Sequence, residues 1–161
     1  MKWLAAAGAL LRWACGLQRM DAGGASSPVA RGLASVEVAP IEGRAGWLVR
    51  NALVDRLSVG GQADKSYRLE VRLDDSLQGL GVLSDDAISR ERRTLRARYQ
   101  LIDAASGDIL LDATAGSDAG VDVVSSEYAT IAAEQTALEN LARDVADRIV
   151  LTLSQQFRAS R

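Results

Sequence analysis

The sequence predicts an α+β fold with the element order β-α-β-β-β-α: a four-stranded, mainly antiparallel sheet with two helices packed on one face. Several segments alternate strictly between apolar and polar residues, which is typical of strands that bury one face only. Two other segments repeat apolar residues every three or four positions, which is typical of helices with a single apolar stripe. Because each kind of element must cover its apolar face, we expect the helices to pack on the sheet.

The longest periodic segment covers residues 126–157, and its apolar residues share one helix face. These residues are Ile131, Leu138, Leu141, Ala142, Val145, Ile149, Leu153 and Phe157. On the opposite face, Asp144 and Arg148 have the i,i+4 spacing of an ion pair. A helix of this length would extend roughly 48 Å at about 1.5 Å per residue. So long an apolar stripe implies a second layer, which the preceding strands can supply.

The N-terminal half of the domain predicts one short strand and one helix. Residues 34–39 alternate as a strand that Pro40 ends, and Gly43 and Gly46 predict a turn. Residues 47–57 then place their apolar side chains on one face, which predicts a helix of about three turns that ends at Gly60 and Gly61.

The remaining strands follow the helix directly in the sequence. Residues 67–73 and 95–101 alternate strictly, and each predicts a half-buried strand. Residues 74–89 contain Gly79, Gly81 and the pair Asp85-Asp86, and we interpret them as a strand with a bulge leading into a hairpin. Residues 103–108 predict a turn and 109–113 begin a fourth strand, whereas 116–124 are polar and interrupted by glycine.

The first residues are typical of a targeting segment. Lys2 precedes the apolar run 4–11, which is too short to cross a bilayer but suits a secretory signal. Cys15 follows the small residue Ala14, which predicts a bacterial lipoprotein in which this cysteine is acylated. We therefore expect a signal peptide at 1–14, a lipidated cysteine with a flexible tether at 15–33, and a single domain at 34–158. An unmodified thiol in a cytosolic protein, a non-lipidated export signal and a wrongly assigned start are the alternatives.

The composition excludes several classes of function. The 19 basic and 21 acidic residues give a net charge of −2, which argues against a bulk electrostatic grip on nucleic acid. The chain has no histidine and one cysteine, so the commonest general base, metal ligands and disulfides are missing. We expect no enzyme, no cofactor and no metal site.

Arginines form the one concentration of like charge in the sequence. Six of them fall on the outward face of two predicted strands: Arg68, Arg72, Arg90, Arg92, Arg96 and Arg98. Guanidinium groups bind phosphate and carboxylate through paired hydrogen bonds, so the six are candidates for an anion-docking face. The alternative is a solvated sheet face with counter-charges at Asp74, Asp75, Asp85 and Asp86.

Short motifs along nearly the whole chain resemble a known family. They are Val36-x-Val38-x-Pro40-Ile41-x-Gly43-Arg44, Leu48-x-x-Asn51-x-Leu53, Tyr67-Arg68-Leu69-x-Val71, Ser89-Arg90 before Tyr99-x-Leu101-x-Asp103, Glu127-Tyr128-Ala129-x-x-Ala132-x-Glu134, and the leader Cys15-Gly16-Leu17-Gln18. In order and spacing they resemble the lipopolysaccharide-assembly lipoprotein LptE of alphaproteobacterial type.

The resemblance implies an outer-membrane lipoprotein that faces the periplasm. Such a protein would form a complex with the large β-barrel protein LptD, plug that barrel, help it to assemble and bind lipopolysaccharide. The six arginines would then contact the lipid or the partner. The alternative function is a periplasmic lipid-binding accessory lipoprotein of a membrane transporter, which would use the same fold without a barrel.

Overall fold

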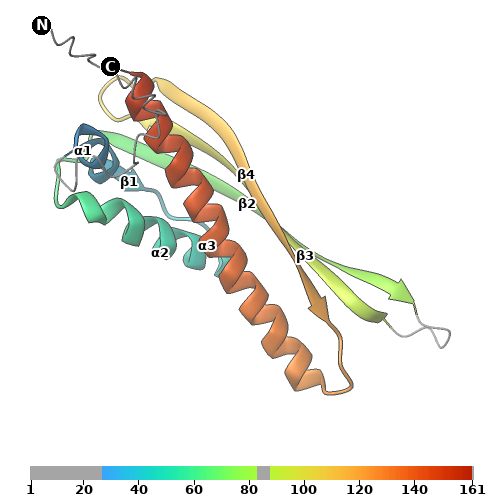
Figure 1. Cartoon of the computed structure of the whole chain (residues 1–161). Helices are drawn as coiled ribbons and strands as arrows, with labels where there is room; N and C mark the ends of the chain where they lie inside the picture. Colours follow the sequence, from blue (N-terminus) through green and yellow to red (C-terminus); the bar gives the residue numbers. More distant parts are fainter. Residues whose placement is uncertain (1–26, 83–87, 161) are drawn as a thin grey trace, which may run out of the picture.

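The computed structural model describes residues 27–82 and 88–160, which form one α+β unit (Figure 1). Four strands form one sheet in the order β1-β2-β3-β4. The strands are β1 (Val36–Val38), β2 (Tyr67–Val82), β3 (Ile88–Asp103) and β4 (Ile109–Asp122). β1 runs parallel to β2, and the other two pairs are antiparallel. The predicted mainly antiparallel, four-stranded sheet is therefore confirmed.

Helices cover one face of this sheet. The two main ones are α2 (Gly43–Leu57) and α3 (Glu127–Ala159), and α3 lies along the sheet (Figure 1). The odd-numbered residues of the long strands face the helices; Leu69, Leu95 and Leu101 are fully buried there. They pack against the apolar stripes of both helices in one core. The pairing of two amphipathic helices with one sheet face is the architecture that the sequence predicts.

A short helix replaces part of the predicted tether. Helix α1 (Pro28–Ala34) has proline at its first turn, and the Ser27 hydroxyl accepts a hydrogen bond from the Ala30 amide at 3.0 Å. Gly60, in the 3₁₀ turn η2 (Ser58–Gly60), comes so close to α1 that a Cβ there would lie 2.3 Å from the Ala30 carbonyl oxygen. The prediction of a flexible segment through residue 33 is wrong for residues 28–33, because tertiary packing stabilises this turn of helix.

Helix α2 begins four residues earlier than predicted. Gly43, with φ of +77°, is its first residue, and a Cβ at Gly46 would lie 2.6 Å from the Ile41 carbonyl oxygen. Glycine at position 46 thus permits a close approach between the helix and the preceding segment, whereas the sequence suggests a turn.

The strands are longer and more regular than the sequence suggests. The β2–β3 register is unbroken from Tyr67 opposite Asp103 to Val82 opposite Ile88, so the predicted bulge is absent from the described part of this pair. A register shift occurs instead between β3 and β4, at Leu101 and Ile102. β4 continues through the glycine-interrupted stretch to residue 122. Cys15 and the predicted hairpin carrying Asp85 and Asp86 lie outside the described residues.

Among the helices that the structure describes, none combines the length and the apolar character needed to span a bilayer.

Candidate anion-binding groove

The six candidate arginines lie on one face of the sheet, opposite the helices. All six occupy even-numbered positions of β2 and β3, whereas the odd-numbered positions face the core. All six are exposed. This face has no helix over it among the described elements (Figure 1). The six arginines thus point to the same uncovered face of the sheet, as strand alternation predicts.

Three of the six arginines form ion pairs on their own face. Arg98 donates from Nη2 to Asp112 Oδ2 at 2.9 Å and from Nε to Oδ1 at 3.2 Å. Arg90 lies 3.1 Å from Asp122, and Arg68 pairs with Glu70. Two of these carboxylates, Asp112 and Asp122, belong to β4 beside β3. The sequence does not predict them as counter-charges, because strand register cannot be read from it.

The other three arginines have no carboxylate within ion-pair distance in the described part of the chain. They are Arg72, Arg92 and Arg96. Arg72 stands directly opposite Arg98 in the β2–β3 ladder, an arrangement in which like charges repel. Asp74 stands opposite Arg96 in the same ladder, without a contact close enough for an ion pair. An anionic ligand would therefore relieve an existing repulsion at Arg72.

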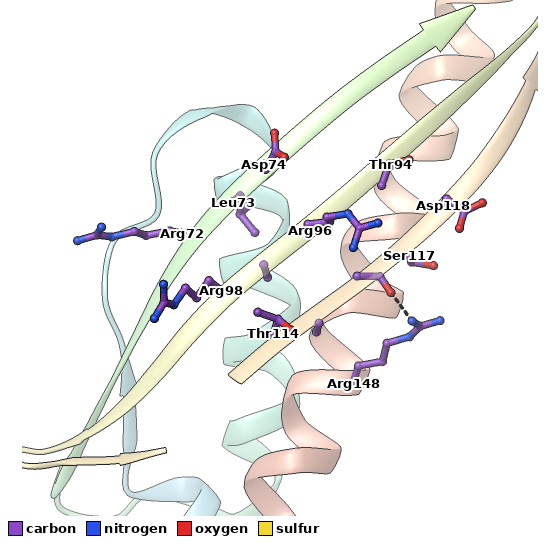
Figure 2. Close-up of a pocket in the computed structure, with 13 residues that line it drawn as sticks. Arg72, Leu73, Asp74, Thr94, Arg96, Arg98, Thr114, Ser117, Asp118 and Arg148 are labelled. Atoms are coloured by element: carbon purple, nitrogen blue, oxygen red, sulfur yellow. Dashed lines mark hydrogen bonds between the residues drawn. The ribbon is translucent and has the colours of Figure 1, made fainter. Parts of the chain in front are cut away.

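A groove with a volume of about 630 Å³ is lined by three of the predicted arginines and by Arg148, which was not among the six candidates (Figure 2). Arg72, Arg96 and Arg98 line it from the sheet, and Arg148 reaches it from α3. The Arg148 guanidinium donates to the Gly116 carbonyl oxygen on β4, and Figure 2 shows its side chain directed from the helix toward that strand. The ion pair that the i,i+4 spacing predicts between Asp144 and Arg148 does not form, and Asp144 instead accepts a hydrogen bond from the Ser117 hydroxyl at 3.2 Å.

Two glycines of β4 lie beside arginines of β3. A Cβ on Gly116 would be 3.4 Å from Cγ of Arg96, and a Cβ on Gly120 would be 3.5 Å from Nε of Arg90. These are ordinary van der Waals distances, so the Arg96 stem and the Arg90 guanidinium lie next to the β4 backbone. The part of β4 from residue 114 to residue 118, which includes the start of the polar, glycine-interrupted stretch, lines the groove.

The remaining three candidates, Arg68, Arg90 and Arg92, lie outside the groove. Arg92 is four residues from Arg96, which corresponds to roughly 13 Å along a strand. The six arginines are therefore distributed along the sheet and do not form a single compact site.

The groove is electropositive. Its lining contains four arginines and two aspartates, Asp74 and Asp118, which gives a charge of +2 from four positive and two negative groups. Hydrogen bonds from Arg98 and then Gln100 lower the pKa of the adjacent Asp112. The hydrogen bond with Asp112 likewise raises the pKa of Arg98. Several guanidinium groups around one hollow are suited to bind phosphate or carboxylate groups.

No metal-binding cluster of acidic or thiol side chains occurs in residues 27–82 and 88–160.

Comparison with known proteins connects this fold with the bacterial cell envelope. A family model described as LptE, lipopolysaccharide-assembly, matches residues 33–153. No curated protein matches the chain in sequence.

Solved structures share the fold over most of the chain. A candidate lipoprotein from Caulobacter crescentus CB15 has 26% identity and a TM-score of 0.66, over 81% of this chain and 96% of that one. A minor lipoprotein from Acinetobacter baumannii has 16% identity and a TM-score of 0.62, over 75% and 91% of the two chains. Lipoprotein B from Nitrosomonas europaea has 17% identity and a TM-score of 0.59, over 80% and 91%. The last two likenesses concern the fold alone.

The family model spans three quarters of the sequence, from helix α1 almost to the end of α3. With the matching sheet and helices, it shows that the chain belongs to the LptE lipopolysaccharide-assembly family.

Proposed function

We propose that this protein is an outer-membrane lipoprotein, anchored through acylated Cys15 at the periplasmic face, that binds lipopolysaccharide. It forms a complex with an LptD-like β-barrel, plugs the barrel and helps it to assemble. Membership of the lipopolysaccharide-assembly family supports this role. The observation that carries the binding proposal is the electropositive groove on an open sheet face.

The groove offers guanidinium groups that are not already neutralised. Arg72 and Arg96 form no ion pair with the described residues, whereas Arg98 is engaged by Asp112. Lipopolysaccharide carries phosphates and acidic sugars, and a phosphate accepts two parallel hydrogen bonds from one guanidinium. We therefore assign Arg72 and Arg96 as the main anion ligands, with Arg98 and Arg148 at the rim.

A pair of matched variants tests the groove. The double variant Arg72→Gln/Arg96→Gln removes both charges and should weaken binding of purified lipopolysaccharide by about tenfold or more, since hydrogen bonds to charged groups contribute roughly 1.5–3 kcal/mol each. The variant Arg92→Gln removes an exposed arginine of the same face outside the groove and should change binding less than about twofold. Surface plasmon resonance at two salt concentrations measures both.

The same measurement can contradict the proposal. Equal loss of binding in both variants would indicate a diffuse electrostatic effect of the sheet face. Unchanged binding in the double variant would show that the groove is not the site. Lipopolysaccharide stripped of its phosphates should bind the wild-type protein as weakly as intact lipopolysaccharide binds the double variant.

Two measurements test the anchor and the complex. Mass spectrometry of the mature N-terminus should find an acylated Cys15. Purification of the tagged, full-length chain from detergent-extracted outer membranes should bring an LptD-like barrel in equal amount. A chain that arrives acylated and without a barrel would favour the accessory lipoprotein of a membrane transporter.

A further inference from the structure

One edge of the sheet is covered for only a small part of its length. β2 has 16 residues, but its neighbour β1 has three and pairs only with Tyr67, Arg68 and Leu69. The last hydrogen bond of this pair runs from the Ala39 amide to the Leu69 carbonyl oxygen at 3.0 Å. Pro40 follows, and proline has no N–H with which to continue a ladder.

The hydrogen bonds between β1 and β2 show which backbone groups of β2 point toward this edge of the sheet. The same alternation identifies the β2 groups beyond Leu69 that point toward the edge. The Tyr67 amide donates to the Ser35 carbonyl oxygen at 3.2 Å, and the Leu69 carbonyl accepts from Ala39, so odd-numbered residues of β2 present their N–H and C=O groups to this edge. By the two-residue period of a strand, Leu73, Asp75, Leu77 and Gly79 point the same way. No residue in the described parts of the chain hydrogen-bonds to these backbone groups. We call the segment 73–79 the free edge.

Helix α3 contacts the opposite edge of the sheet at two points. Along β4, the Gln156 side chain donates to the Leu110 carbonyl oxygen at 3.3 Å, and Arg148 donates to the Gly116 carbonyl oxygen. Both donors come from α3, which lies beside that edge. Proteins usually cover, charge or interrupt exposed strand edges, because an open edge is a template for another strand. In Figure 1 the distal half of β2 has β3 on one side and no element on the other.

We propose that the free edge of β2 receives an extended segment of the barrel partner as a fifth strand, which makes the contact in the complex a main-chain ladder. This inference rests on the proposed function and deepens it by naming the surface. The strands of a closed barrel are paired on both sides, so they have no free backbone groups. The incoming segment is therefore a loop of the partner that lies outside its closed wall.

The side chains beside the free edge define the chemistry of the incoming strand. On the helix side, Leu73 is half-buried and Leu77 is 42% exposed, so an apolar residue of the incoming strand would cover Leu77. On the open side, Asp74 is exposed, stands opposite Arg96 in the β2–β3 ladder and forms no ion pair with the described residues. The segment that fits thus alternates apolar residues with polar ones, and carries a basic residue next to Asp74.

Paired substitutions at one position separate the main chain from the side chain. Leu77→Pro removes an outward N–H without breaking the β2–β3 ladder, and Leu77→Ala removes the side chain but keeps the N–H. Gly79→Pro and Gly79→Ala repeat the comparison two residues further along. The full-length tagged variants are purified from outer-membrane detergent extract, and the LptD-like barrel recovered per mole of chain is quantified. Circular dichroism and thermal unfolding of each purified variant establish that it is folded.

We expect both proline variants to recover about tenfold less barrel than wild type and both alanine variants to recover nearly as much. Folded proline variants that retain the barrel would overturn the inference and leave the proposed function intact. A wild-type chain that recovers no barrel would instead refute the proposed function. If light scattering shows that the purified wild-type chain dimerises and Leu77→Pro is monomeric, the occupant of the edge is a second copy, which also overturns the inference.

Discussion

Arg92 and Arg93 are adjacent in the sequence and lie on opposite faces of the sheet. Arg92 is exposed on the open face. Arg93 faces the helices, with its side chain only 16% exposed, and donates to both carboxylate oxygens of Asp75 at 2.9 and 2.7 Å. It also donates to the Glu134 carbonyl oxygen at 3.1 Å, which ties the hairpin to α3. Because side chains alternate along a strand, Arg92 lies on the surface and Arg93 helps to hold the hairpin against α3.

This difference predicts unequal effects of the same substitution on stability. Arg93→Ala leaves Asp75 partly buried without its partner and should lower the free energy of unfolding by about 1–3 kcal/mol. Arg92→Ala should change it by less than about 0.5 kcal/mol, as is usual for exposed residues. Urea unfolding followed by circular dichroism measures both. Equal effects of the two substitutions would contradict the assigned orientations.

The ion pair between Arg98 and Asp112 predicts a pH dependence with a definite sign. The pKa of Asp112 is lowered from its ordinary value of 3.8, first by the hydrogen bond from Arg98 and then by the one from Gln100. A carboxyl group with a lowered folded-state pKa contributes stability above its unfolded-state pKa, and this contribution is lost as the pH falls through the folded-state pKa. The stability that Asp112 contributes is therefore lost below about pH 4.

The carboxyl carbon of Asp112, followed by NMR during acid titration, should report this shift. Its midpoint should lie below 3.8 in the wild-type protein and move upward in Arg98→Ala. The variant Arg90→Ala removes an arginine that pairs with another carboxylate, and should leave the midpoint of Asp112 in place. A midpoint that is insensitive to Arg98 would show that the pair does not persist in solution.

At the scale of elements, α3 joins most of the other parts of the molecule. Its buried stripe includes Leu141, Val145, Ile149 and Leu153, which pack against α2 and the sheet in one core. Arg56 of α2 donates to Asp147 of α3, with Nη2 and Oδ2 3.0 Å apart, and the Phe157 ring packs at a tilt of 53° against Tyr67, with 5.2 Å between ring centroids. The helix is therefore fixed both near its middle and near its C-terminal end.

Two residues of α3 allow a direct test of its apolar stripe. Ile149 is fully buried, whereas Leu151, two residues further on, is 43% exposed. Ile149→Ala should lower the free energy of unfolding by about 2–5 kcal/mol, because it removes buried methylene groups and leaves a cavity. Leu151→Ala should cost less than about 1 kcal/mol. Chemical unfolding of both variants makes the comparison, and similar losses would contradict the packing of this helix.

The sequence predicts element types better than element ends. Strict alternation identifies β2 and β3, and the apolar repeat identifies α3, because these periods are properties of the local chain. Two glycines, Gly32 and Gly46, show why local sequence is ambiguous at this residue type. A Cβ at Gly32 would lie 3.0 Å from the Phe157 ring, and a Cβ at Gly46 would lie 2.6 Å from the Ile41 carbonyl oxygen. Glycine is favoured both in flexible segments and where two parts of the chain approach closely, and the local pattern does not distinguish the two cases.

At the scale of the whole molecule, the two faces of the sheet have different tasks. One face packs against the helices and holds the fold together, and the other leaves the arginines and the groove open (Figures 1 and 2). The two edges also differ. Helix α3 donates two hydrogen bonds to the backbone of β4, whereas most of β2 has no paired strand on its outer side. Both candidate interaction surfaces thus lie where the helices do not cover the sheet.

The α+β class, the four strands, the two main helices and the common face of the six arginines can all be predicted from the sequence. These features follow from repeats of two and 3.6 residues, which are present in each local segment of the chain. Three other features are visible only in the folded molecule: Asp112 and Asp122 pair with two of those arginines, Arg148 joins the groove from α3, and β2 keeps an open edge. Strand register and the meeting of distant residues decide such contacts, and packing of the whole molecule sets both.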